Sequence, residues 1–129
     1  IQSFMSGVPA LKKLKTSLAQ TLTLRGHLIG LDRRPLYCRS DFKALNVLLQ
    51  GAGAVIMKQA LVEFLRIAKQ PFVLHANIHD EVQFSCDEEH ADDLGKAFVQ
   101  AIKDAGTTLK FKCPLDGEYN IGNNWAETH

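Results

Sequence analysis

The stretch from Pro71 to Cys86, PFVLHANIHDEVQFSC, constrains the fold more than any other part of the chain. Apolar and polar residues alternate on both sides of an acidic centre, which is typical of two half-buried strands. The centre, His79-Asp80-Glu81, would then form a hairpin turn, although tight turns favour glycine because it tolerates a positive φ. The two adjacent carboxylates repel each other unless a divalent cation stabilises them. The alternative is a solvated acidic turn.

The alternation also predicts how this hairpin packs. We expect Asp80 at its tip, one face covered by helices and the opposite face more open. The residues predicted on the covered face are Leu74, Ala76, Ile78, Val82 and Phe84.

Three helices and a second hairpin are predicted around it from capping residues, apolar periodicity, glycines and prolines. The helices cover Ser6 to Arg25, Ser40 or Asp41 to about Lys69, and Asp87 to Gly106. The second hairpin pairs Leu28–Leu31 with Pro35–Cys38, and a further strand covers Leu109–Lys112. Helices placed between hairpins indicate an α+β fold, with antiparallel hairpins packed against long helices. At this length we expect a single unit over residues 1–129.

Composition excludes several classes of protein. The three cysteines form neither a disulfide framework nor a zinc motif, which indicates a reducing cytosol. No apolar run approaches the roughly 20 residues of a membrane helix. A net charge of +1 gives no global basic field that would favour nucleic acid. The chain starts at Ile1 without an initiator Met or a signal segment, and we expect it to be part of a longer protein.

Two amides on the second predicted helix are candidates for binding. Asn46 and Gln50 are one helical turn apart and therefore project from the same side. Gly51 and Gly53 follow, each costing about 1 kcal/mol of helix propensity relative to Ala. We expect a neighbouring strand or a ligand to approach there, and packing against a strand is the favoured interpretation.

Five stretches resemble the family A DNA polymerases, and they follow one another along the chain in the order of that family. Ile78–Phe84, IHDEVQF, resembles their motif C, and Ala44–Lys58 resembles the palm helix that precedes it. Gly30–Ser40 resembles the hairpin before that helix. The segments FKCPLD and GNNWAETH, the latter ending at His129, resemble the carboxyl end of the replicative polymerases of short-tailed phages. The resemblance covers essentially the whole chain.

The resemblance implies that the chain is the carboxyl-terminal palm portion of a DNA-directed DNA polymerase that uses two Mg²⁺ ions. Asp80 would be a metal ligand, and Glu81 a second catalytic carboxylate outside the first coordination shell. His79 would lie beside the primer terminus, and Asn46 and Gln50 would contact the minor groove of the primer-template. Implied partners are primer-template DNA and deoxynucleoside triphosphates in the cytoplasm of a bacterial or phage-infected cell, with no membrane.

Other parts of the family's active site have no counterpart here. The second metal-binding aspartate and the nucleotide-binding Lys and Tyr of the family precede the region covered, and Asp41-Phe42-Lys43 does not replace them. We therefore expect the isolated chain to be inactive, to bind Mg²⁺ weakly or not at all, and to associate with itself through uncovered surfaces.

The acidic turn also fits two other functions. A metal phosphohydrolase would use His75, His79 and Asp80 as ligands, but such enzymes carry the adjacent His-Asp on a helix rather than between strands. A noncatalytic nucleic-acid-binding remnant would use the acidic turn only as surface.

Overall fold

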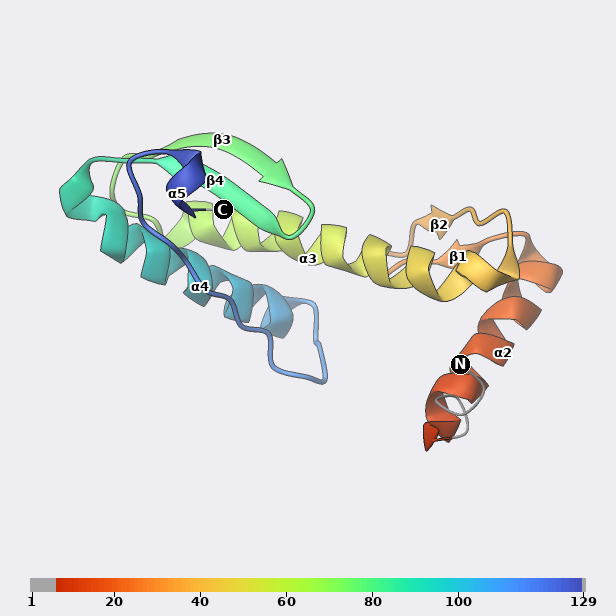
Figure 1. The fold of residues 1–129 in the computed structure, drawn as a ribbon. Coiled ribbons are helices and arrows are strands. Elements are labelled where there is room, and N and C mark those ends of the chain that lie inside the picture. Colours follow the sequence, from red (N-terminus) through yellow and green to blue (C-terminus); the bar gives the residue numbers. More distant parts are fainter. Residues whose placement is uncertain (1–6, 129) are drawn as a thin grey trace. The chain divides into compact units, whose positions relative to one another are not determined.

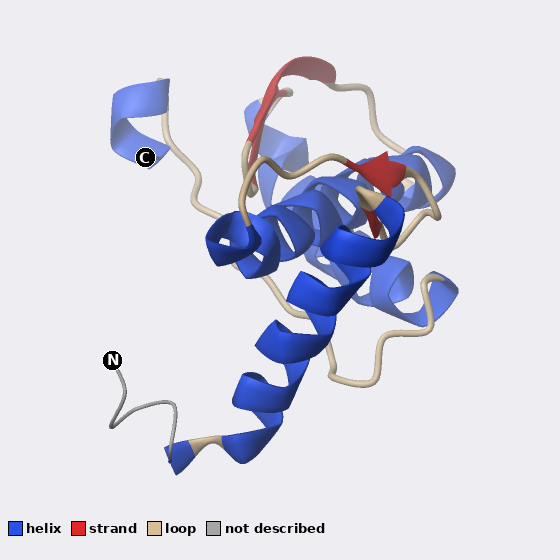
Figure 2. Ribbon diagram, turned by 90° about the vertical axis from the view of Figure 1, so that its right-hand side faces the viewer, coloured by secondary structure: helices blue, strands red, loops and turns tan. Residues whose placement is uncertain are grey.

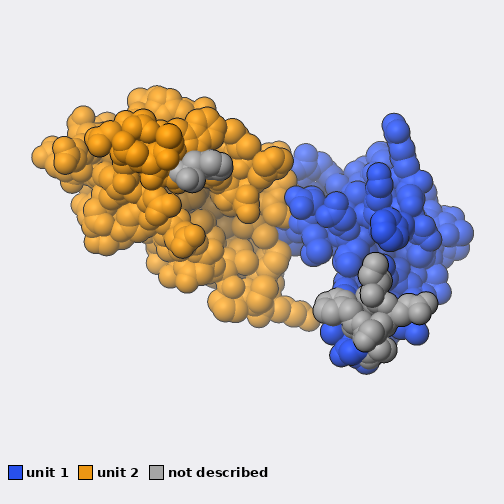
Figure 3. Space-filling model, viewed as in Figure 1, with its two compact units in different colours: residues 1–52 blue, residues 53–129 orange. Residues whose placement is uncertain are grey.

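The computed structural model describes residues 7–128, so Ser6 and His129 lie outside the described part. The chain forms two compact units, residues 1–52 and 53–129, coloured separately in Figure 3. Each unit has its own hydrophobic core. Helix α3 (Ala44–Ile67) runs through the boundary. The single unit expected over residues 1–129 stays a prediction.

Unit 1 is built around a short hairpin. Helix α2 (Pro9–Arg25) ends at Gly26, whose φ of 73° allows the reversal into strand β1 (Leu28–Ile29). Strand β1 pairs antiparallel with β2 (Pro35–Leu36), so the predicted hairpin is confirmed with shorter strands. The core of the unit consists of Leu18, Leu28 and Ala44.

Polar side chains start the long helix as predicted. The backbone N–H of Phe42 donates to Ser40 Oγ at 3.3 Å and to Asp41 Oδ1 at 2.8 Å. These bonds cap a 3₁₀ turn, η1 (Asp41–Lys43), which continues into α3. A Cβ at Gly51 would lie 3.1 Å from Leu36 Cδ1, so the predicted close approach is made by a strand.

Unit 2 places a β-hairpin against two helices (Figure 1). Strand β3 (Val73–Ile78) pairs antiparallel with β4 (Glu81–Ser85), and the contacting helices are α3 and α4 (Ala91–Thr108). Four aromatic rings join them, with centroids 4.8 to 6.1 Å apart: Phe64, Phe72, Phe84 and Phe98. The structure combines helices with two small antiparallel strand pairs, and Figure 2 shows helices in blue and strands in red. This combination confirms the α+β class.

The carboxyl end of α4 differs from the prediction. The helix continues past Gly106 to Thr108, and Leu115 packs on Gly106, where a Cβ would lie 3.0 Å from Leu115 Cγ. The predicted strand Leu109–Lys112 is wrong: Lys110 has φ 55°, and the Phe111 N–H donates to the Gly106 carbonyl at 2.9 Å. These helix-terminating bonds replace strand pairing.

The start of α4 also differs. Asp87 was expected to cap it, but Asp87 makes no side-chain cap and precedes a 3₁₀ turn, η2 (Glu88–His90), with α4 following from Ala91. Glu88 and Glu89 lie in that turn.

The chain after α4 returns along the same helix. The ring of Tyr119 lies against Gly95, and the Tyr119 hydroxyl donates to Asp92 Oδ1 at 2.6 Å. A last short helix, α5 (Trp125–Thr128), lies at the hairpin (Figure 1).

Helix α3 corrects one expectation from composition. The helical stretch of residues 41–67 is long and apolar enough to span a membrane, since its most apolar 18-residue window has a mean hydropathy of 1.4. Core helices of soluble proteins meet the same criterion. Met57, Ala60 and Phe64 of α3 are buried in the protein itself.

Candidate functional site

The acidic turn is a two-residue loop at the end of a well-anchored hairpin. Ile78 pairs with Glu81, which leaves only His79 and Asp80 between the strands, both exposed. His79 has φ 56°, a conformation that costs an L-residue about 1–2 kcal/mol but that His adopts more readily than most residues. On β4, Phe84 packs against Phe64 and Phe98, so the strand leading from the turn is fixed by the core. The predicted place of Asp80 at the tip is confirmed.

A β-bulge changes which residues share a face. Between Leu74 and Ala76 the register shifts, so Leu74 pairs with Phe84 while Ala76 pairs with Gln83. Paired residues lie on the same face of an antiparallel pair, and one inserted residue reverses the alternation. The predicted covered face is therefore only partly right. Val82 and Phe84 pack on the core, whereas Ala76 and Ile78 pair with Gln83 and Glu81 on the opposite face, where Ile78 is 44% exposed. Leu74 pairs with Phe84 and so stays on the predicted face, although it is 46% exposed.

Glu81 is engaged by two N–H donors. Its Oε1 accepts hydrogen bonds from Gln83 Nε2 and, at 3.1 Å, from Trp125 Nε1 of α5. Gln83 in turn accepts from Thr128 Oγ1 at 3.4 Å. Sequence patterns did not predict the Trp125–Glu81 and Thr128–Gln83 contacts, because these partners lie 44 and 45 residues apart; the only Trp of the chain was the available signal.

Asn46 and Gln50 both lie exposed on α3, in unit 1. Their spacing of one turn places both amides on one side of the helix, as predicted. The structure does not relate them to the hairpin, which belongs to unit 2.

The phosphohydrolase alternative lacks support. His79 and Asp80 lie in a turn between strands, and the His75 ring is hydrogen-bonded to Ser85 Oγ at 2.7 Å. Within residues 7–128, no three His, Cys, Asp or Glu side chains form a group that could hold a metal ion. For Mg²⁺, the exposed carboxylate of Asp80 supplies the hard oxygen donor that this ion prefers, but further donors must come from elsewhere.

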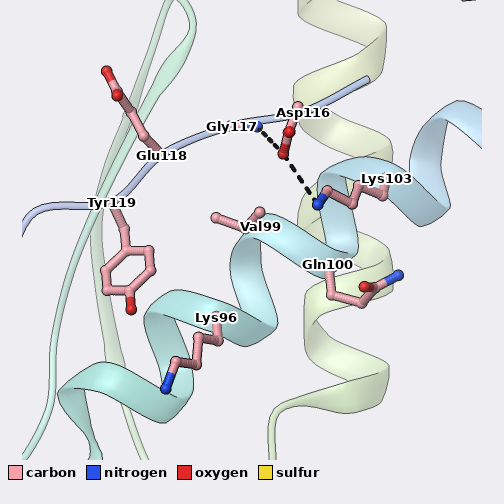
Figure 4. A pocket seen from close by; sticks show the side chains of 8 residues that line it. All are labelled: Lys96, Val99, Gln100, Lys103, Asp116, Gly117, Glu118 and Tyr119. Carbon is pink, nitrogen blue, oxygen red and sulfur yellow. Dashed lines mark hydrogen bonds and ion pairs between the residues drawn. The ribbon is translucent and has the colours of Figure 1, made fainter. Parts of the chain in front are cut away.

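Two hollows in unit 2 are lined mainly by side chains that are paired with neighbouring groups or are apolar. The larger, about 500 Å³, lies between α4 and the segment at Asp116 (Figure 4). Its cation Lys103 bonds Asp116 at 3.2 Å, and Lys96 bonds Asp92. Beside the smaller one, burial raises the pKa of the Cys86 thiol, which keeps the sulfur in its unreactive protonated form.

Charge is distributed unequally along the chain. Residues 1–52 contain eight Lys or Arg and two Asp or Glu, whereas residues 53–129 contain seven and twelve. The small net charge of the whole chain hides this difference. Unit 1 is basic and suits phosphates, whereas the acidic unit 2 carries the hairpin.

Comparison with known sequences identifies the family. The sequence model of DNA polymerase family A matches residues 1–127. The chain belongs to DNA polymerase family A. The expectation from the motif-C-like turn and its flanking segments is thereby confirmed, and family A DNA polymerases use divalent metal ions.

Several phage family A polymerases are similar to this chain. The DNA-directed DNA polymerase of Escherichia phage Phieco32 is 38% identical over 115 residues, which cover 81% of this chain and 19% of the phage protein. The DNA-directed DNA polymerases of Enterobacteria phage T3 and Escherichia phage T7 are each 32% identical over 152 residues, covering 99% of this chain and 22% of theirs. The chain thus spans about one fifth of the length of these relatives.

Proposed function

We propose that this chain supplies the carboxyl-terminal palm portion of a DNA-directed DNA polymerase, which acts in the cytoplasm of a bacterial or phage-infected cell. The observation that carries the proposal is the exposed Asp80 at the tip of a core-anchored hairpin, in a chain that matches family A over 127 residues. A carboxylate on a stiff element keeps a defined position, which metal-assisted catalysis requires.

Asp80 is assigned as the metal ligand of this portion. When Mg²⁺ is bound, it stabilises charge on the attacking and leaving oxygens of nucleotidyl transfer. Asp80 would supply one oxygen ligand for that ion, and Glu81 supplies a second negative charge one residue away. His79, which has a positive φ in the turn, is assigned to the primer terminus.

Asn46 and Gln50 are assigned to the minor groove of primer-template DNA. All Watson–Crick pairs present acceptors at similar places in that groove, so two amide donors can contact a correct pair without reading its sequence. The exposure of both amides on one side of α3, in the basic unit, supports this role. Phosphate contacts by the Lys and Arg side chains of unit 1 would then position the duplex.

The decisive experiment is primer extension by a longer protein that carries the upstream family motifs together with this chain. Asp80→Asn is expected to lower kcat by several orders of magnitude while leaving the circular dichroism spectrum and DNA affinity unchanged, because a metal post acts mainly in the transition state. Asp93→Asn, which removes an exposed carboxylate from α4, is the matched control and should extend normally. Near-normal extension by Asp80→Asn would refute the assignment.

The second candidate is a noncatalytic nucleic-acid-binding portion. It is favoured by the missing three-ligand cluster among residues 7–128. Fluorescence titration of the 129-residue chain with labelled primer-template, with and without Mg²⁺, separates the two functions. DNA binding by the 129-residue chain that Mg²⁺ does not alter, together with no primer extension by the longer protein, would establish this second candidate. For the isolated chain we expect no primer extension, because Asp80 is the only carboxylate of the turn that is assigned as a metal ligand.

A further inference from the structure

We propose that Trp125 is a positioning residue for the acidic turn: its indole N–H orients the Glu81 carboxylate and keeps it beside Asp80 as an outer negative charge rather than a metal ligand. The inference extends the proposed function of the turn, on which it rests. It assigns a role to α5, which the metal and DNA assignments leave unused.

Four side chains form hydrogen bonds that connect α5 to β4. Trp125 Nε1 donates to Glu81 Oε1 at 3.1 Å, and Gln83 Nε2 donates to the same oxygen. Thr128 Oγ1 donates to Gln83 Oε1 at 3.4 Å. Trp125 and Thr128 are three residues apart and therefore lie on one side of α5. The short helix is attached to the strand at two successive outward positions.

The alternation of β4 determines which face α5 contacts. Val82 and Phe84 point to the aromatic core, so Glu81 and Gln83 point to the opposite face. The strand that carries the acidic residue next to Asp80 is thus fixed from both sides. The core fixes its backbone, and α5 fixes the direction of its carboxylate.

The segment before α5 is shaped to present Trp125. Glu127 accepts hydrogen bonds from the Asn123 backbone N–H at 2.8 Å and from Asn124 Nδ2 at 2.7 Å. A Cβ at Gly122 would lie 2.6 Å from Glu127 Cβ, so a larger residue at Gly122 would displace this turn. The sequence GNNWAET thereby builds a compact support for the indole.

Two N–H donors on one carboxylate oxygen have a defined chemical effect. They stabilise the negative charge and restrict rotation of the carboxylate, and hydrogen bonds to a charged acceptor are stronger than those between neutral groups. An oxygen that already accepts two bonds is a poorer ligand for Mg²⁺, which demands near-ideal octahedral geometry. Asp80, exposed at the tip, then remains the metal ligand, and Glu81 contributes negative charge from a fixed position.

The first test needs no enzymatic activity. Trp125 is the only Trp in the chain, so a ¹H–¹⁵N spectrum of the 129-residue protein contains one indole N–H signal. Glu81→Ala should move that signal upfield and accelerate its exchange with solvent, because the indole loses its charged acceptor. Glu89→Ala, at an exposed carboxylate in η2, is the matched control and should leave the signal in place. An indole signal unaffected by Glu81→Ala would overturn the proposal.

The second test uses the longer polymerase. The Trp125→Phe variant keeps an aromatic side chain but removes the N–H donor. Its kcat should fall about 10-fold to 100-fold, while its KM for nucleotide changes less than about twofold. If Trp125 acts through Glu81, the double variant Trp125→Phe/Glu81→Gln should be no slower than Glu81→Gln alone. Fully multiplicative losses, or an unchanged kcat in Trp125→Phe, would overturn the proposal.

The two tests fail independently of the proposed function. Asp80→Asn reports whether the turn is catalytic at all, and the indole signal reports the Trp125–Glu81 bond without catalysis. A polymerase that needs Asp80 but whose indole signal ignores Glu81 would retain its function and refute the positioning role.

Discussion

At the scale of single residues, several hydrogen-bond donors stabilise the buried acid Glu63. Glu63 on α3 is 8% exposed and accepts hydrogen bonds from Gln59 at 2.7 Å, Arg66 at 3.0 Å and, across to α4, Thr108 at 3.1 Å. These bonds, above all the one from Gln59, lower the pKa of the Glu63 carboxyl from its ordinary value of 4.5. The folded state therefore favours the charged form.

This shift makes stability depend on pH in a defined direction. Because the folded pKa is lower than the unfolded one, the contribution of Glu63 is complete above about pH 4.5 and is lost as the pH falls through the folded pKa. Urea midpoints measured from pH 7 to pH 3 should therefore fall less steeply for Glu63→Gln than for the parent chain, and the variant should be less stable at pH 7. Glu89→Gln, an exposed acid, should follow the parent curve. Identical slopes for Glu63→Gln and parent would contradict this account.

At the scale of elements, two glycines in helices meet opposite surroundings. A Cβ at Gly95 of α4 would lie 2.3 Å from Tyr119 Cδ2, whereas nothing lies within 4 Å of a Cβ at Gly53 of α3. Gly95 thus permits the return segment to contact α4, with the Tyr119 hydroxyl bonded to Asp92. Gly53 only lowers helix propensity.

We predict opposite effects of the same substitution at these sites. Gly95→Ala should lower the free energy of unfolding by about 1–3 kcal/mol, because the tyrosine ring must move from α4. Gly53→Ala should raise it by up to about 1 kcal/mol, because it improves helix propensity without a steric conflict. Urea denaturation followed by circular dichroism measures both. A stabilising Gly95→Ala would show that Tyr119 is not packed on α4 in solution.

At the scale of the whole molecule, several large apolar side chains of α3 are exposed. Leu49, Val62 and Leu65 are 60%, 44% and 68% exposed, and only 11% of the most apolar window of this helix is buried. The chain also spans about one fifth of the length of its phage relatives. We expect this surface to be covered by other polypeptide when the chain acts in a polymerase.

The isolated chain should therefore associate with itself. Light scattering at high micromolar concentration should show species larger than 14.3 kDa, with an average mass that rises with concentration. The double variant Val62→Ser/Leu65→Ser should shift association to higher concentration, since it removes apolar surface from one side of α3. Leu24→Ser on α2, where the leucine is 83% exposed, is the matched control and should associate like the parent. A purely monomeric parent chain would refute the expectation.

Local sequence patterns determined the helices, both hairpins and the place of Asp80 in the turn, because periodicity, caps and turn residues act over a few neighbouring positions. The ordered stretches around the turn also determined the family, which the match over residues 1–127 confirms. Only the tertiary structure decided the bulge beside His75, which exposes Ile78, and the continuation of α4 past Gly106 under Leu115. The Trp125–Glu81 bond joins residues 44 positions apart, and such contacts depend on how the elements pack rather than on any local pattern.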